Sequence, residues 1–339
     1  MRRREFIWAL GSAAAWPLAA RAQQPGYSTG QRPKTHRIAV VALATPIALI
    51  TETSPNLDFR DFFLELRRLG YVEGENLLVN RFSAEGNPNL YSEVVAGVIR
   101  SAPDVIFGFS PGLVKMLKDA TSAIPIIGYT GDPIAYGLVT NLARPGGNVT
   151  GVSVDAGVEI TGKRLSLFKE IMPTASRLAV LAPRAYWTGP SAIREVAGQL
   201  GFTVVGRPFE LPVDEAEFRS VFGALQKDRA DVLYVADLPE NNANADLVRE
   251  LADRAHVPII TARRQFWKAE SLMSYGPDAV DLIRRAAGYI DEVLRGAKPG
   301  ELPFLQPTKF ELIINLKVAK SFGLTVPPTL LSTADEVIE

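Results

Sequence analysis

The sequence predicts an α/β protein with two lobes, each built around a parallel β-sheet. Short apolar runs alternate with amphipathic segments along nearly the whole chain, a pattern typical of βαβ units. The 339 residues exceed one ordinary α/β core and suit two. In the stretch 131–151, the run Pro145-Gly146-Gly147 stops any helix, and the strand–helix alternation then starts again.

The first lobe is expected over residues 36–150. Its strands are expected at 36–43, 77–82, 105–109 and 124–129, and its helices after Ser54, from Tyr91 and after Ser110. Asp132 followed by Pro133 predicts a further helix N-terminus, because proline at the first helical position loses no hydrogen bond.

The second lobe is expected over residues 151–274, after a strand at 149–154. Its strands are expected at 178–181, 202–205, 231–237 and 257–260, and its helices at 162–172, after Pro190, at 215–226 and at 244–255. Residues 274–277 predict a second crossing, so that about 275–308, with a long amphipathic helix at 278–294, return to the first lobe. We assign about 309–339 to the second lobe, although the pattern leaves both lobes open for this segment.

The first 22 residues predict an export signal that is removed from the mature protein. Arginines at 2–4 precede an apolar stretch at 6–20, and the A-x-A motif at 20–22 predicts cleavage after Ala22. The arginine pair, with phenylalanine two residues later, is similar to the twin-arginine export motif. An ordinary secretory signal is the alternative. Residues 23–35 are expected to be a flexible lead-in, and the mature protein to be exported and soluble.

The composition excludes several classes of protein. Lys+Arg and Asp+Glu both number 37, so the chain lacks the basic surplus of a general nucleic-acid binder. The absence of cysteine excludes disulfides, thiolate metal sites, cysteine nucleophiles and a lipid-modified N-terminal cysteine. There are two histidines, and the sequence contains no phosphate loop. We therefore expect a protein without metal or cofactor that is not an enzyme.

Loops that follow the expected strands carry the candidate binding residues. In the first lobe these loops are Thr45-Pro46, Ser110-Pro111-Gly112 and Asp132-Pro133. They belong to one sheet edge, where parallel α/β sheets bind ligands, and helix N-termini there suit an anion. In the second lobe the loops carry Tyr186, Trp187, Asp237 and the run 263–267. The alternative is that these residues only cap helices or pack at the hinge.

Several segments resemble one family of transport proteins. They are GYVEGEN (70–76), AEGNP (84–88), GDPI (131–134), LARPGGNVTGVS (142–153), GKRLSLFKEIMP (162–173), LMSYGPD (272–278), the long segment 294–331 and ADEVIE (334–339). The chain resembles ABC transporter substrate-binding proteins of the tryptophan-type family. The resemblance implies a type I periplasmic binding fold, a Venus-flytrap of two Rossmann-like lobes that close on a ligand. It also implies a monomer in the periplasm that delivers its ligand to an inner-membrane permease.

The resemblance also implies a ligand site between the lobes. Carried over by position, it consists of Thr45, Pro46, Ser110, Pro111, Gly112, Tyr129, Thr130, Asp132, Tyr186, Trp187, Asp237, Arg264, Gln265 and Phe266. Ser110 and helix N-termini would hold a carboxylate of a small organic ligand, and Asp237 or Asp132 would receive an amino group if the ligand is an amino acid. Aromatic side chains would stack on an aromatic amino acid or aromatic acid.

Two other functions stay open at this point. A ligand sensor of the same fold would show the same sequence features as a transport protein. A hydrolase would need facing carboxylates across the cleft, for which Asp132 and Asp237 are the candidates.

Overall fold

The first sheet contains five parallel strands. The computed structural model describes residues 34–154, 158–188, 193–263 and 271–339. Across the sheet the strands are β2 (Leu77–Ser83), β1 (His36–Ala42), β3 (Val105–Phe109), β4 (Ile126–Thr130) and β5 (Val149–Ser153). Each neighbouring pair is parallel, so the carboxyl ends of all five strands lie at one edge.

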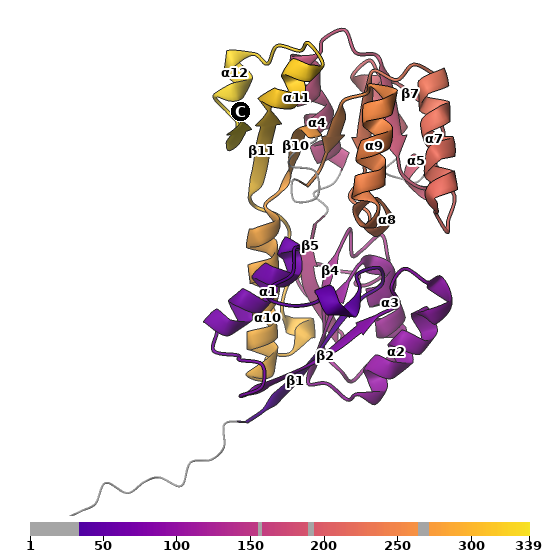
Figure 1. The fold of residues 1–339 in the computed structure, drawn as a ribbon. Coiled ribbons are helices and arrows are strands. Elements are labelled where there is room, and N and C mark those ends of the chain that lie inside the picture. Colours follow the sequence, from indigo (N-terminus) through magenta and orange to yellow (C-terminus); the bar gives the residue numbers. More distant parts are fainter. Residues whose placement is uncertain (1–33, 155–157, 189–192, 264–270) are drawn as a thin grey trace, which may run out of the picture. The chain divides into compact units, whose positions relative to one another are not determined.

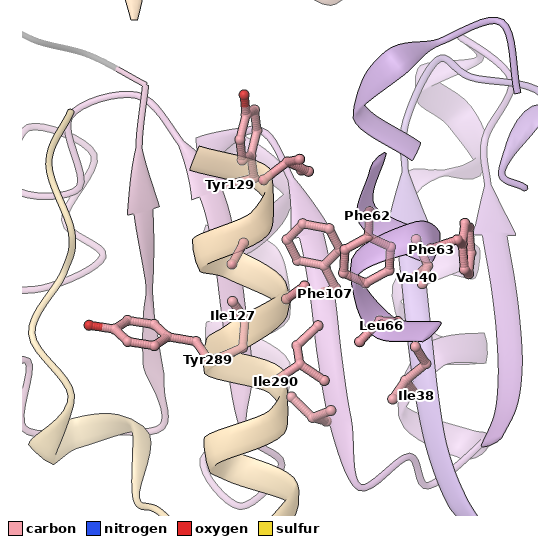
Figure 2. Packing of buried hydrophobic residues seen from close by; sticks show 14 of the residues in the cluster. Ile38, Val40, Phe62, Phe63, Leu66, Phe107, Ile127, Tyr129, Tyr289 and Ile290 are labelled. Atoms are coloured by element: carbon pink, nitrogen blue, oxygen red, sulfur yellow. The ribbon is translucent and has the colours of Figure 1, made fainter. Parts of the chain in front are cut away.

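Helices cover both faces of the first sheet. They are α1 (Leu57–Arg68), α2 (Tyr91–Arg100), α3 (Pro111–Ala120) and α10 (Ala279–Leu294). Helices α1 and α10, far apart in the sequence, share one core with the sheet, whereas α2 and α3 share the core on the opposite face (Figure 1). Figure 2 shows the first of these cores, in which the ring centroids of Phe62 and Phe107 lie 4.4 Å apart in a stacked arrangement. Ile290 of α10 belongs to the same core. Strands β3 and β4 are almost wholly apolar because both of their faces are buried.

Helix α1 illustrates why these residues form these elements. Phe59, Phe62 and Leu66 recur at helical spacing and are each at most 2% exposed. The helix begins at Asn56, whose side-chain oxygen accepts the N–H of Asp58 at 2.9 Å. Ser54, the start suggested by the sequence, instead accepts the N–H of Asn56 and shapes the turn before the helix.

The second sheet contains seven strands. Their order is β12 (Glu336–Ile338), β11 (Phe310–Asn315), β10 (Ser271–Pro277), β9 (Ile259–Thr261), β8 (Val232–Val235), β6 (Arg177–Leu181) and β7 (Thr203–Val205). All neighbouring pairs are parallel except β10 with β11, which is antiparallel. The segment after residue 309 therefore contributes two strands to the second sheet.

Helices also cover both faces of the second sheet. They are α4 (Val158–Ile171), α5 (Arg184–Thr188), α6 (Ile193–Gln199), α7 (Glu215–Lys227), α8 (Pro239–Ala243), α9 (Ala245–Ala255), α11 (Leu316–Ser321) and α12 (Pro328–Leu331). One core contains residues of α4, α6, α11 and α12, and the other contains residues of α7 and α9. Short 3-10 helices complete the elements at Ile47–Leu49, Pro88–Leu90 and Pro299–Glu301.

The chain passes between the sheets more than once. Strand β5 of the first sheet ends at Ser153, beyond the lobe boundary expected at 150. Strand β10 of the second sheet ends at Pro277, beyond the lobe boundary expected at 274. The segment before β11 follows the edge of β5, where the Leu305 N–H donates to Gly151 at 2.9 Å and the Ser153 N–H donates to Leu305 at 2.7 Å. Residues 35–339 form one compact unit.

The predicted helix at Asp132 is wrong. Asp132 does accept the N–H groups of Ile134 and Ala135, at 2.8 and 3.1 Å, as an N-cap would. The residues that follow form turns, and Gly137 has a φ of +66°, which helices do not accommodate. The cap-plus-proline pattern therefore produced a capped turn without a helix.

Other differences come from short elements and from one glycine. Residues 184–188, expected as a loop, are helix α5, and α8, α12 and β12 were not predicted. Residues 274–277, expected as a crossing, form the end of strand β10, and helix α10 on the first sheet begins at Ala279. A Cβ atom at Gly276 would lie 2.1 Å from the Ala262 carbonyl oxygen. This glycine therefore permits a close approach of backbones and does not mark a turn.

Candidate functional site

The end of strand β4 supplies Tyr129, the one aromatic residue predicted for the first-lobe site. Its side chain is 5% exposed, and its ring centroid lies 5.5 Å from that of Phe109 at the end of β3. Figure 2 shows its hydroxyl pointing away from the core residues Phe107 and Ile127. Among the described residues this hydroxyl has no hydrogen-bond partner. Burial raises the pKa of the phenol, so the hydroxyl keeps its proton.

Ser110 lies next to Tyr129 across the sheet edge. Its N–H donates to the Tyr129 carbonyl at 3.0 Å. Its side-chain oxygen accepts the N–H of Leu113 at 3.4 Å and so caps helix α3, whose first residue is Pro111. Its φ of +88° is a conformation that favours glycine. The hydroxyl proton of Ser110 is not used in the capping bond, so it can serve a ligand.

The strained backbone of Ser110 yields a prediction. Ser110→Ala should lower the free energy of unfolding by about 1 kcal/mol, because it removes the cap and keeps the unfavourable φ. Ser110→Gly should stay within about 0.5 kcal/mol of the wild type, because glycine tolerates both the N-cap position and the positive φ. Urea denaturation of the variants checks this. Equal losses in both would contradict the conformational argument.

Arg263, which directly follows strand β9, lies at the centre of a charged cluster. Its Nη2 donates to both carboxylate oxygens of Asp58, at 2.6 and 2.7 Å, and its Nη1 donates to Asp237 at 3.4 Å. The side chains of Arg263, Asp58 and Asp237 are 10%, 8% and 18% exposed. Asp58 belongs to α1, which packs on the first sheet, whereas Asp237 follows β8 of the second. The cluster therefore joins elements of both sheets.

The same guanidinium lies over the ring of Tyr129. Its central carbon is 5.8 Å from the ring centroid, a distance at which a cation and an aromatic ring attract. Burial alone would lower the pKa of Arg263, but the negative charges of Asp237 and Asp58 raise it well above the ordinary value. Tyr129, Arg263 and Asp237 thus form one connected group. We call Asp58, Asp237, Arg263 and Tyr129 the charged cluster.

Asp237 also accepts a hydrogen bond from Asn242 of α8 at 2.8 Å. With Arg263 on its other oxygen, its carboxylate is held by partners on two sides. Asp132 is exposed and its carboxylate is used to cap a turn. The described contacts therefore do not bring Asp132 and Asp237 together as a pair of facing carboxylates.

Tyr186 and Trp187 both lie on helix α5. The Trp187 side chain is 2% exposed and belongs to a core of the second sheet, with the guanidinium of Arg194 5.1 Å from its ring. The Tyr186 hydroxyl lies 3.2 Å from that of Tyr234, to which Arg164 also donates at 3.0 Å. The aromatic residues of α5 thus pack on the second sheet, and their role in ligand binding stays a prediction.

The other predicted site residues have varied surroundings. Thr45 is half-buried and Pro46 exposed in the loop after β1, and Gly112 is exposed in the first turn of α3. Thr130, 1% exposed, donates its hydroxyl to the Gly131 carbonyl at 3.0 Å. Arg264, Gln265 and Phe266 lie outside the described residues. The contacts above connect Ser110, Tyr129 and Asp237, and they do not link the remaining residues to this group.

Sequence reasoning missed Asp58, and it predicted the loop of Arg263 without naming Arg263 as a site residue. Asp58, Asp61 and Glu65 recur at helical spacing beside the apolar face of α1, and all three are buried. Acidic residues at buried positions indicate partners elsewhere, and this signal could have been noticed. Arg263 lies in the predicted loop, immediately before Arg264, but nothing local distinguishes the two arginines.

The described ranges hold no group of three or more His, Cys, Asp or Glu side chains arranged for a metal ion. Within the same ranges, no helix has the length and apolar character needed to cross a membrane.

Comparison with known proteins shows the family to which this chain belongs. Residues 47–338 match the family model of ABC transporter substrate binding proteins. A tyrosine-binding protein from Clostridioides difficile is 26% identical over 279 residues, which cover 80% of this chain and 78% of that protein.

Solved structures share the fold. A conserved domain protein from Vibrio cholerae has a TM-score of 0.78 at 25% identity, and an ABC domain in complex with L-Trp from Streptococcus pneumonia has 0.79 at 24%. Each likeness covers 90% of this chain and 100% of the other. The predicted fold, two α/β lobes of the type I periplasmic binding kind, is confirmed. Because the family model spans nearly all of the described chain, this protein belongs to the ABC transporter substrate binding proteins.

Proposed function

We propose that this chain is the solute receptor of an ABC importer. It binds a small organic ligand that carries a carboxylate and an aromatic group, and it delivers this ligand to an inner-membrane permease. In this proposal the protein is exported, cleaved after Ala22 and active in the periplasm as a monomer. Binding takes place between the lobes, and contacts to both lobes stabilise the closed form.

The charged cluster is the observation that carries this proposal. Tyr129 and Ser110 come from the carboxyl edge of the first sheet, and Arg263 and Asp237 from that of the second, where ligands of such sheets bind. The half-buried ring of Phe109 lies 5.5 Å from that of Tyr129 and offers an aromatic surface. The tyrosine-binding relative and the fold shared with the L-Trp complex support an aromatic ligand.

A binding screen tests this function. The mature protein, from residue 23, is first examined by native mass spectrometry for a bound small molecule. Its thermal unfolding is then followed with L-tyrosine, L-tryptophan, L-phenylalanine, L-leucine, benzoate, 3-(4-hydroxyphenyl)propionate and, as a control without carboxylate or ring, myo-inositol. A ligand at a hundredfold excess over its Kd should stabilise the protein by about 2.7 kcal/mol.

The outcomes separate the classes of function. We expect an aromatic compound with a carboxylate to raise the melting temperature and myo-inositol to leave it unchanged. If none of the panel raises it, the proposed ligand class is wrong. If a compound is chemically converted during the assay, the protein is an enzyme and the importer proposal fails.

A further inference from the structure

An open pocket lies between helices α1 and α10, which pack side by side on the first sheet (Figure 1). It measures about 410 Å³ and is lined by Asp61, Leu64, Glu65, Arg68 and Arg284. These residues are different from those of the charged cluster and from the predicted ligand-binding residues. The pocket is therefore a feature separate from the candidate ligand site. We call it the α1–α10 pocket.

Leu64 is an exposed apolar side chain of the α1–α10 pocket. It is 47% exposed, whereas Phe62 and Leu66 on the core side of the same helix are at most 1% exposed. Helical spacing places Arg60 one turn before Leu64, and Arg67 and Arg68 one turn after it. Arginine is enriched and lysine depleted at protein interfaces, so an exposed leucine among arginines suits contact with another protein.

The charges around Leu64 are separated by depth. The Asp61 and Glu65 side chains are 11% and 10% exposed, whereas their partners Arg60 and Arg68 are 43% and 69% exposed. Arg68 donates to both carboxylate oxygens of Glu65, at 2.9 and 2.6 Å, and these bonds lower the pKa of Glu65. The carboxylates thus lie beneath the guanidiniums, and the outward charge of this face is positive.

Arg284 of α10 completes the α1–α10 pocket. Its side chain is exposed, and among the described residues it forms no ion pair and no hydrogen bond. Its charge does act on Glu65, but the hydrogen bonds of that carboxylate come from Arg68. The donors of Arg284 are therefore available to a carboxylate from outside the chain, which a guanidinium binds with two parallel hydrogen bonds.

We propose that the α1–α10 pocket is a docking surface for a periplasmic loop of the permease. This loop presents a carboxylate to Arg284 and an apolar side chain to Leu64. The inference rests on the proposed function, which supplies the permease, and goes beyond it by assigning the surface. The concave shape favours a protein over an anionic membrane, because protruding side chains fill a pocket and a flat layer of lipid head groups does not.

The first test is photo-cross-linking in the cells that produce the protein. The photoreactive residue p-benzoyl-L-phenylalanine replaces Leu64, or Leu211 as the matched control. Leu211 is 58% exposed and lies before α7, on the second sheet. We expect irradiation to join position 64 to a membrane protein with several spanning helices, identified by mass spectrometry. Position 211 should give no such product.

The second test reverses a charge beside the photoreactive residue. Arg284→Glu places a carboxylate against the carboxylate of the partner, so the cross-link from position 64 should fall about tenfold or more. Arg100→Glu is the matched control, because Arg100 is also exposed but ends helix α2 on the opposite face of the first sheet. This control should leave the cross-link unchanged. Urea denaturation of both variants shows whether they are folded.

The purified variants separate docking from ligand binding. Arg284→Glu should keep any rise in melting temperature that a ligand causes in the wild type, because the α1–α10 pocket is not the ligand site. If no compound of the panel binds and the cross-link to the permease is present, the proposed ligand class fails and the docking surface stands. If a compound binds and position 64 gives no cross-link to a permease, the docking surface is refuted and the ligand proposal stands.

Two further results would overturn this inference. Equal cross-linking from positions 64 and 211, or an equal loss in Arg284→Glu and Arg100→Glu, means that the α1–α10 pocket has no specific role. Co-sedimentation of the wild type with phosphatidylglycerol vesicles is the test for a membrane, and we expect none. If the protein does sediment with them and Arg284→Glu abolishes this, the surface binds lipid and the permease loop is the wrong occupant.

Discussion

Gly151→Ala is expected to lower the free energy of unfolding by about 3 kcal/mol or more, the range of severe backbone conflicts. Gly151 of β5 pairs with Gly128 of β4, and its φ is +154°. A Cβ atom at this position would lie 2.0 Å from the Gly128 carbonyl oxygen and 2.6 Å from its nitrogen. Because the atoms that clash with this Cβ belong to the backbone of Gly128, the two strands would have to separate to remove the clash. The strand displaced carries Tyr129, so ligand binding should be lost as well.

Gly288→Ala is the matched control for this substitution. Gly288 lies inside helix α10, and a Cβ atom there would meet nothing within 4 Å. Alanine should therefore stabilise the protein by about 0.5–1 kcal/mol, because it restricts the unfolded chain and favours the helix. Urea denaturation followed by circular dichroism measures both variants. If Gly151→Ala unfolds at the same urea concentration as the wild type, the close approach of β4 and β5 is not real.

Arg263→Met is expected to lower the free energy of unfolding by about 3–5 kcal/mol, the usual result of breaking a buried ion pair from one side. The substitution leaves the carboxylates of Asp58 and Asp237, 8% and 18% exposed, without their cation. Adding Asp58→Asn should recover part of the loss, because one of the two uncompensated charges is then removed. Urea denaturation of the single and double variants measures this coupling.

Arg219→Met is the control for Arg263→Met. Arg219 pairs with Glu215 one turn away on α7, with side chains that are 42% and 64% exposed. Such exposed pairs contribute about 0.3–0.5 kcal/mol, so the loss should be no larger than that. If the two arginine variants lose equal stability, the cluster around Arg263 is not buried as the structure has it.

Much of the fold could be predicted because its elements are long and carry periodic apolar residues. The apolar runs at β1 and β3 and the helical spacing in α1 and α10 predicted those elements within a few residues. The short elements α5, α12 and β12 escaped because three to five residues show no period. The helix expected at Asp132 failed because a cap pattern also suits an isolated turn.

The sequence by itself determined the class of fold, the family resemblance and the loops in which binding residues were to be sought. Alternating apolar runs require buried parallel strands, and the carboxyl ends of such strands locate the loops. Only the tertiary structure decided which charged residues meet. Asp58 and Arg263 are 205 residues apart, and no local pattern relates them. Their contact exists because helix α1 of one sheet and the end of β9 in the other place two buried charges side by side, where each compensates the other.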